Sequence, residues 1–293
     1  MDLGRTGIWA FQLDLQPAAR AREVAAELES LGYGSLWLPE VAGRDPFVAA
    51  AMFLGATDRI VLATGIANIY ARDAIAMASA QRTLTEAFPD RFLLGLGVSH
   101  QVAVEGMRGH EYAPPVPAMR AYLDAMDAAP WFAIEVPVPT RRVLGALGPK
   151  MLALAGSRAD GAHPYLVTPD HTAMAREVLG DGPLLVPEQK VVLETDPDAA
   201  RAVARRMLAT YLSLPNYINN LRRLGFGDDD LADGGSDRLV DALVVWGDED
   251  AVAARAAAHR DAGADHVCVQ VLGAGFTDLP VEQWRHLAPA LTA

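Results

Sequence analysis

The segment Arg91–His100 (RFLLGLGVSH) contains the residues of this chain best suited to carry out chemistry. Its apolar first half is too short for a helix and shows no polar alternation, which is typical of a strand buried on both faces of a parallel sheet. Gly95 and Gly97 allow backbone or a flat ligand to approach closely. Ser99 and His100 place a hydroxyl group and a titratable ring where the strand should end, the position that carries the chemistry in barrel enzymes. The alternative interpretation is a pair of packing glycines followed by a solvated loop histidine.

The ends of the other predicted strands carry many glycines and few charged groups. They comprise Phe11, Glu40, residues 64–68, residues 145–148, residues 163–165 and Glu188. These positions hold no carboxylate pair with the spacing of a glycosidase, and no HExxH, GxSxG or P-loop motif. The only lysines are Lys150, in a predicted helix, and Lys190, in the middle of a predicted strand, which disfavours Schiff-base chemistry. Such a site suits a broad planar cofactor that lies against backbone and carries its own reactivity.

Composition favours a protein that acts on small molecules. The chain has 293 residues, 51% of them hydrophobic, and a formal net charge of −12, whereas a nucleic-acid-binding protein would have a basic surface. No apolar run is long enough to span a membrane and residues 1–15 lack the features of a signal peptide, so we expect a cytoplasmic protein. Cys268 is the only cysteine, and its apolar surroundings predict a buried core residue. The acidic segment 227–235 has no spaced set of metal ligands, so we expect a solvated loop and no metal site, with divalent metal binding as the alternative.

Strand-like runs alternate with helical segments along the chain. The predicted strands span residues 8–13, 35–39, 60–67, the run from Arg91, and residues 142–147, 162–167, 184–193 and 266–272. The predicted helices span residues 16–31, 45–56, 73–88, 118–128, 148–159, a helix from Thr168, 198–224 with a break at Pro215, 236–245, 248–262 and a last helix near Trp284. The proline-rich segment 131–140 cannot be a central strand, so we expect an excursion over the surface or across the mouth of a barrel.

This alternation predicts an α/β protein of one domain, a (β/α)8 TIM barrel spanning residues 1–293. A doubly wound sheet is the alternative architecture. It should show fewer strands and a glycine fingerprint after the first strand, where this chain has AFQLD. The barrel would bring the strand ends named above to one common opening.

Four motifs resemble those of a known family. They are TGIANIYARD (residues 64–73), RFLLGLGVSH (91–100), GALGPKMLALAGSRADGAHPY (145–165) and WGDEDAVAARAAAHRDAGADHVCVQ (246–270). In order and spacing they resemble the luciferase-like monooxygenase family, and most of all its branch that uses the deazaflavin coenzyme F420. The resemblance covers nearly the whole chain. It implies an oxidoreductase with a flavin-type cofactor and, because relatives commonly form dimers, a homodimer.

The resemblance also implies contacts with the cofactor ring. The candidate residues are Glu40, Thr64, Gly65, Ile66, Asn68 and Ser99. The third strand of these proteins often carries a non-proline cis peptide behind the ring, which here would join Gly65 to Ile66. Asn68 would lie near the polar edge of the ring, and Glu40 matches an acidic position beside it.

Further implied roles concern the cofactor's phosphate tail and proton transfer. The candidate tail contacts are Gly145, Ala146, Leu147 and Gly148, with His163, Pro164 and Tyr165 on the neighbouring turn. Val41 stands where the sugar-phosphate dehydrogenases of this branch have a histidine, and His100 stands where they have a proton-donating glutamate. A sugar phosphate is therefore a poor substrate candidate. His100 can transfer a proton near neutral pH, or it anchors the cofactor without exchanging protons.

The leading hypothesis is a coenzyme F420-dependent oxidoreductase that moves a hydride between the cofactor and a small organic substrate. An FMN-dependent monooxygenase is the first alternative, because a shelf of glycine and apolar residues accepts either ring. A cofactor-free barrel lyase or isomerase and a barrel that binds a flavin without turnover are the others. The sequence does not identify the substrate, because the groups that select it lie on loops whose conformation cannot be derived from the sequence.

Overall fold

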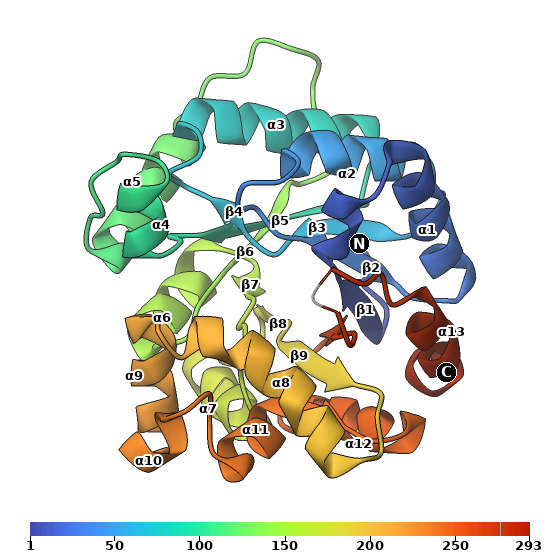
Figure 1. Cartoon of the computed structure of the whole chain (residues 1–293). Helices are drawn as coiled ribbons and strands as arrows, with labels where there is room; N and C mark the ends of the chain where they lie inside the picture. Colours follow the sequence, from blue (N-terminus) through green and yellow to red (C-terminus); the bar gives the residue numbers. More distant parts are fainter. Residues whose placement is uncertain (276) are drawn as a thin grey trace.

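The polypeptide forms parallel strands surrounded by helices, as the computed structural model shows for residues 1–275 and 277–293 (Figure 1). The strands are β1 (Thr6–Trp9), β2 (Ser35–Leu38), β3 (Val61–Thr64), β4 (Ala67–Asn68), β5 (Phe92–Gly97), β6 (Arg141–Leu144), β7 (Gly161–Ala162), β8 (Leu184–Leu185), β9 (Glu188–Val192), β10 (Val244–Trp246) and β11 (Val267–Val271). Every pair of neighbouring strands among them is parallel.

The helices lie between the strands in the chain and outside them in space. They are α1 (Ala18–Ser30), α2 (Pro46–Leu54), α3 (Ala74–Ala87), α4 (Gln101–Gly106), α5 (Pro115–Asp127), α6 (Pro149–Arg158), α7 (Pro169–Leu179), α8 (Pro197–Tyr211), α9 (Pro215–Arg223), α10 (Asp228–Leu231), α11 (Asp237–Leu243), α12 (Glu249–Asp261) and α13 (Val281–Thr292). A short 3-10 helix, η1 (Gln12–Leu15), follows β1. Asp45, Asp73 and Thr168, with which three of the predicted helices begin, cap α2, α3 and α7 through their side chains.

The sheet closes through the run that contains β8 and β9. Its pairing path is β10, β9, β11, β1, β2, β3, β5, β6, β7, β8, with β4 beside β5. On one side of the run, the Glu188 amide donates to the Pro164 carbonyl (2.9 Å); on the other, the Cys268 amide donates to the Pro187 carbonyl (3.0 Å). β8 and β9 thus act as one strand between β7 and β11. Within the described residues this gives the predicted (β/α)8 barrel, with β10 added beside β9.

Alternate residues of the strands pack into separate cores inside and outside the barrel. The interior is filled by Leu3, Trp9, Trp37, Val61, Ala63, Leu93, Val143, Val186 and Cys268. Cys268 is fully buried, which confirms its predicted place in the core. Strand residues of the opposite parity, such as Leu36, Leu62 and Leu94, pack against the surrounding helices.

Several predicted elements differ from the observed ones. Residues 12–15 turn into η1, so the first strand ends at Trp9. Of the predicted strand 162–167, only Ala162 belongs to an observed strand, β7 (Gly161–Ala162). The predicted helix 236–245 ends at Leu243, and its β-branched valines enter the sheet as β10. Helix α4 and the short α10 within the acidic segment were not expected.

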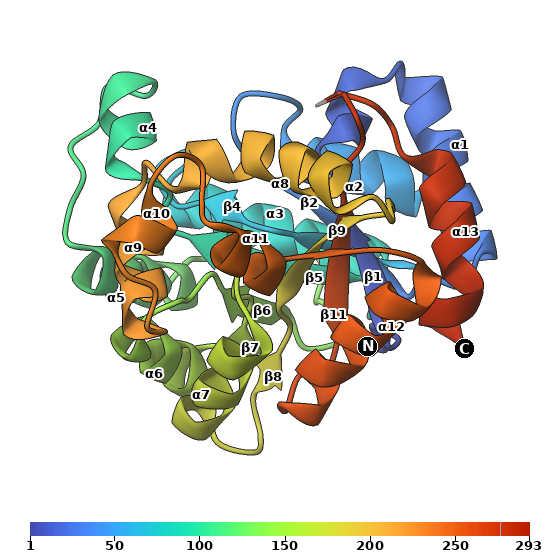
Figure 2. The same ribbon diagram turned by 60° about the horizontal axis from the view of Figure 1, so that its bottom comes forward.

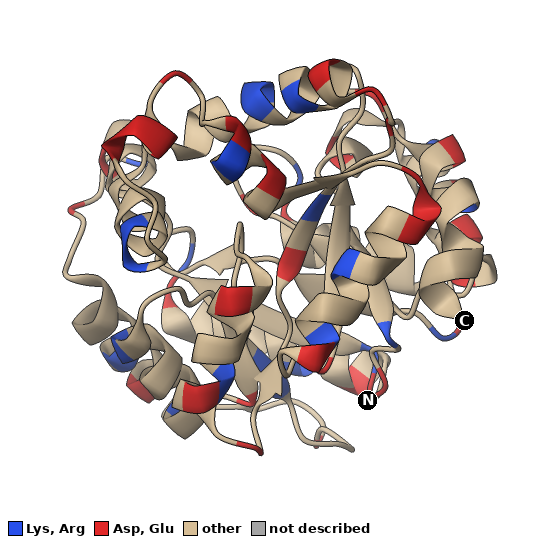
Figure 3. Cartoon of the chain, turned by 90° about the horizontal axis from the view of Figure 1, so that it is seen from below, with Lys and Arg blue, Asp and Glu red and all other residues tan. Residues whose placement is uncertain are grey.

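The outer surface carries most of the charge. Figure 3 shows Lys, Arg, Asp and Glu mainly on the outer helices and the loops. The segment 131–140 projects beyond α3 in Figure 1 and leaves Phe132 96% exposed. Because it precedes β6, it lies at the amino ends of the strands and is a surface excursion. None of the helices described here is long and apolar enough to cross a membrane.

Candidate active site

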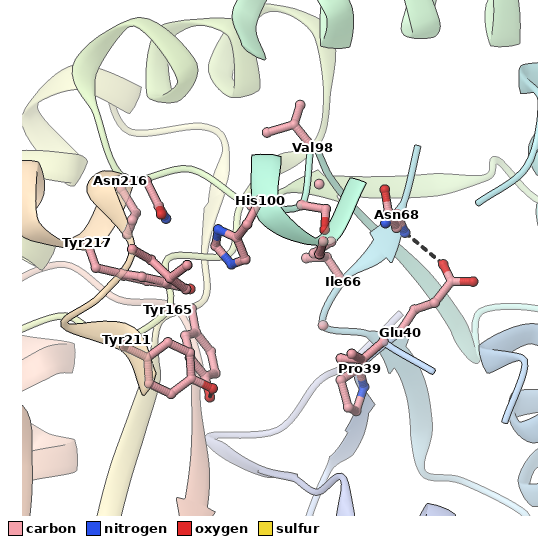
Figure 4. Close-up of a pocket in the computed structure, with 18 of the residues that line it drawn as sticks. Pro39, Glu40, Ile66, Asn68, Val98, His100, Tyr165, Tyr211, Asn216 and Tyr217 are labelled. Atoms are coloured by element: carbon pink, nitrogen blue, oxygen red, sulfur yellow. Dashed lines mark hydrogen bonds between the residues drawn. The ribbon is translucent and has the colours of Figure 1, made fainter. Parts of the chain in front are cut away.

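A cavity of about 360 Å³ lies at the carboxyl ends of the strands. Its floor and one wall come from strand ends, and the facing wall comes from α8, α9 and the turn between them (Figure 4). Helices α4 and α9 lie on the same side of the molecule in Figures 1 and 2, and both contribute residues to the lining. Most lining side chains are apolar or aromatic, so a bound ring would be largely shielded from water.

Most of the sequence-predicted site residues line this cavity. They are Glu40, Gly65, Ile66, Asn68, Ser99, His100, Gly145, Ala146, Leu147, His163 and Tyr165. Thr64, Gly148 and Pro164 do not line it. The Thr64 hydroxyl is engaged by the backbone of Gly95, donating to its carbonyl (2.7 Å) and accepting from its amide (2.8 Å). The Pro164 carbonyl belongs to the barrel ladder, and Gly148 lies one residue beyond the lining, at the start of α6.

The junction of β3 and β4 forms the shelf expected behind a cofactor ring. The peptide bond between Gly65 and Ile66 is cis, as predicted. The Trp9 indole donates to the Gly65 carbonyl (3.0 Å) and fixes its direction. The Ile66 side chain lies over Gly97, where an added Cβ would be only 2.4 Å from it. Gly95 similarly makes room for the Thr64 carbonyl, so these glycines accommodate the shelf itself and not a ligand directly.

Glu40 braces this shelf from the outer side. Its carboxylate accepts the Asn68 amide (2.7 Å) and pairs with both terminal nitrogens of Arg72. Arg72 also bonds Asp45 (3.0 Å), so three charged side chains hold the end of β4. Figure 4 shows the Glu40 carboxylate directed toward Asn68. Glu40 is therefore placed to position the shelf, although its stem lines the cavity.

His163 supplies an unused acceptor in the floor. Its Nδ1 lies 2.7 Å from the Val186 carbonyl oxygen, which can only accept, so Nδ1 carries the proton. Burial lowers the pKa of His163 to about 4, which keeps the ring neutral at pH 7. Nε2 is therefore an acceptor, and no described residue donates to it. It lies beside Gly65 and the Trp9 indole and is itself buried.

His100 lies at the opening, at the end of β5. Figure 4 shows its ring directed toward Asn216 and Tyr217, and the ring centroids of His100 and Tyr217 are 5.6 Å apart. Burial lowers the pKa of His100 below its usual value, although a hydrogen bond with Asn216 raises it. The ring is therefore neutral at pH 7 and able to accept a proton.

Several lining residues were not predicted from the sequence. Asn216, Tyr211 and Tyr217 come from α8, α9 and the turn between them, which fold back over the barrel mouth. Glu188 was expected at the mouth, but it does not line the cavity and forms a buried ion pair with Lys190 inside the barrel, with 3.0 Å between Oε1 and Nζ. Their spacing of two residues within a strand was the available signal, because it places both side chains on one face.

Buried neutral histidines make the fold sensitive to acid. Burial lowers the pKa of His163, His171 and His266 to about 4 and of His259 to about 3, whereas an unfolded histidine titrates near 6.5. Between pH 6.5 and 4 the unfolded chain thus binds more protons, and the free energy of unfolding falls as the pH falls. Urea titrations should show a lower midpoint at pH 5 than at pH 7, because the free energy of unfolding falls by up to about 2 kcal/mol for each fully buried ring. An unchanged midpoint would contradict these neutral rings.

Comparisons with known proteins agree with this geometry. The model of the luciferase-like monooxygenase family matches residues 4–266. A protein of Mycobacterium tuberculosis, provisionally named a coenzyme F420-dependent oxidoreductase, is 28% identical, with 98% of each chain covered.

Solved structures share the fold at low sequence identity. An F420-dependent secondary alcohol dehydrogenase, solved with an F420–acetone adduct, has a TM-score of 0.74 and 14% identity, with 99% of both chains covered. The oxygenating constituent of 3,6-diketocamphane monooxygenase from Pseudomonas putida, solved with FMN, has a TM-score of 0.68 and 17% identity, with 99% of this chain and 97% of that chain covered. The family match extends over most of the barrel, and the chain therefore belongs to the luciferase-like monooxygenase family of oxidoreductases.

Proposed function

We propose that this protein is a coenzyme F420-dependent oxidoreductase that moves a hydride between the deazaflavin ring and a small organic substrate. The observation that carries the proposal is the shelf of Gly65 and Ile66 at the junction of β3 and β4, which lies in the lining of a largely apolar cavity. Flavin and deazaflavin rings are both flat, and either can lie against such a shelf while the apolar walls shield it from water. The name of the mycobacterial relative favours the deazaflavin over FMN.

The residues of the cavity fit a planar ring. Its volume of about 360 Å³ and its apolar, aromatic walls suit a fused ring system with one polar edge. The Gly65–Ile66 shelf would contact the face of the ring. When bound, the cofactor supplies the site that gives or takes the hydride.

The start of α6 fits the phosphate of the cofactor tail. Gly148 precedes α6, whose first amides have no helical partner, and the helix dipole favours an anion there. A Cβ added at Gly148 would be 3.5 Å from an Arg223 nitrogen, so a guanidinium of α9 lies beside this helix start. Helix amides and an arginine together suit a phosphate group.

We assign proton transfer to His100. It lies at the opening, burial lowers its pKa so that the ring is neutral at pH 7, and Asn216 orients it. A neutral imidazole can take the proton of a substrate hydroxyl as its carbon loses a hydride, and it can return that proton in the reverse direction. Tyr211 and Tyr217 close the facing wall and limit the access of water.

Titration of the purified protein with coenzyme F420 and with FMN tests the proposal. We expect saturable quenching of cofactor fluorescence with F420, and substrate-dependent change of its absorbance near ~420 nm, where the deazaflavin rather than a flavin absorbs. Tighter binding of FMN would indicate the monooxygenase instead. No binding of either cofactor would favour the cofactor-free lyase or isomerase. Binding without any turnover would indicate a barrel that binds a flavin but catalyses no reaction.

Replacing Gly148 should weaken cofactor binding through the tail. Its backbone angles, φ −89° and ψ 157°, suit any residue, so Gly148→Leu should fold while its side chain fills the space next to Arg223. We expect F420 affinity to fall by roughly 10- to 100-fold, the value of one or two charge-assisted hydrogen bonds. Gly182→Leu is the matched control, because a Cβ there meets no atom of the described residues within 4 Å. Equal affinities of the two variants would place the tail elsewhere.

A further inference from the structure

Four polar side chains form a continuous chain from the cavity wall into the barrel. The hydroxyl groups of Tyr211 and Tyr165 are 2.7 Å apart, and Figure 4 shows them meeting at the edge of the cavity. The Tyr165 hydroxyl lies 2.8 Å from Oε1 of Gln270, and the Lys190 Nζ lies 3.0 Å from the same oxygen. Both tyrosines line the cavity, whereas Gln270 and Lys190 are buried behind them.

Lys190 sets the direction of every hydrogen bond in this chain. An ammonium group can only donate, so the Gln270 atom that it contacts must be the carbonyl oxygen. That oxygen only accepts, and the single proton of Tyr165 is therefore donated to Gln270. Tyr211 must then donate its own proton to Tyr165. Its oxygen is left with lone pairs alone for any group in the cavity.

The inner end of the chain is held firmly enough to impose this direction. Lys190 pairs with Glu188 at 3.0 Å, and its Nζ lies 3.7 Å from the centroid of the Tyr165 ring. Glu188 in turn accepts the Leu166 amide (3.1 Å). Gln270 keeps its orientation although its Nε2 has no partner among the described residues. A flipped amide would place the NH2 group against the ammonium, with two donors facing each other.

We propose that Tyr211 recognises a hydrogen-bond donor on the substrate, and that the substrate is a largely apolar molecule bearing a hydroxyl group. A carbonyl or carboxylate at this wall would meet lone pairs and be disfavoured. This inference rests on the proposed function and specifies its substrate class. The hydroxyl bound by Tyr211 is distinct from the group that His100 deprotonates, because one proton cannot be donated to both. Tyr211 is thus a specificity residue, and Lys190 acts through it as a positioning residue.

A pair of probes that differ in one donor tests the inference. Cyclohexanol and methoxycyclohexane share an apolar ring, but only the alcohol can donate. Their dissociation constants are measured by ligand-observed NMR on F420-loaded protein. We expect the alcohol to bind about 5- to 10-fold tighter, the value of one neutral hydrogen bond. Equal affinities, or a preference for the ether, would overturn the inference.

Three variants test whether Tyr211 is the residue that accepts the hydrogen bond from the alcohol. Tyr211→Phe should reduce the alcohol-to-ether preference to about one, and Gln270→Leu should lower it because Tyr165 can then donate to Tyr211. Tyr217→Phe is the matched control, since this tyrosine lines the same wall outside the chain, and it should keep the preference. Loss of the preference in Tyr217→Phe but not in Tyr211→Phe would overturn the assignment.

The cofactor titration of the same proteins separates the two proposals. If Tyr211→Phe weakens F420 binding and leaves the alcohol preference unchanged, the acceptor serves the cofactor and the inference is wrong. If the wild-type protein binds no F420, the proposed function fails, and the probes are measured on the free protein. An alcohol preference that Tyr211→Phe removes would then still support donor recognition by Tyr211, and its absence would overturn it.

Discussion

His100→Ala should lower kcat by about 10²- to 10⁴-fold, the usual contribution of a general acid or base, while cofactor affinity stays within about twofold. The reason is the position of His100 at the end of β5, where Asn216 orients a ring that is neutral at pH 7. In the wild type, log kcat/KM should fall as the pH drops through the pKa of His100, because the protonated ring cannot accept a proton. This decrease of log kcat/KM at low pH should be absent from His100→Ala.

The conservative variant His100→Gln separates proton transfer from anchoring. A glutamine keeps hydrogen-bonding capacity but cannot take up a proton at these pH values. Recovery of kcat in His100→Gln, or a loss of cofactor affinity in His100→Ala that exceeds the loss of kcat, would show that His100 only holds the cofactor. Wild-type kinetics in both variants would exclude it from the chemistry.

Lys190→Met should lower the free energy of unfolding by about 3–5 kcal/mol, because it leaves a buried carboxylate without its partner. The side chains of Lys190 and Glu188 are both 0% exposed. Burial raises the pKa of Glu188 and lowers the pKa of Lys190, and their pairing opposes both shifts. Urea unfolding at pH 7, followed by circular dichroism, provides the measurement.

The double variant Lys190→Met/Glu188→Gln is the control for this effect. It removes the unpaired charge and keeps an oxygen that can accept the Leu166 amide, which Glu188 accepts in the wild type. We expect it to recover most of the lost stability, since replacing both members of a buried pair is often nearly neutral. A single variant that loses less than about 1 kcal/mol would mean that water reaches this pair.

Much of the barrel was predictable because its strands are short apolar runs between clear helix signals. Asp45, Asp73 and Thr168 mark helix starts in the sequence and cap the observed helices. Helix α4 was missed because it has only six residues and no side-chain cap. Strand β10 was missed because Val244 and Val245 continue an apolar helical pattern, and only pairing with β9 makes them a strand.

The candidate site was predictable only where residues follow a strand directly. His100 and His163 end strands and line the cavity, as expected. Tyr211 and Asn216 could not be assigned to it, because the path of α8 and α9 across the opening depends on tertiary packing. The glycines of β5 were correctly linked to a close approach, but the approaching groups are Thr64 and Ile66 of the protein itself.

A crystal structure of the protein with coenzyme F420 tests the central claim most directly. We expect the ring in the cavity, with one face against the Gly65–Ile66 shelf. We also expect the phosphate at the start of α6, near Arg223. A ring bound elsewhere, or a ring in the cavity that does not contact the Gly65–Ile66 shelf, would contradict the central claim.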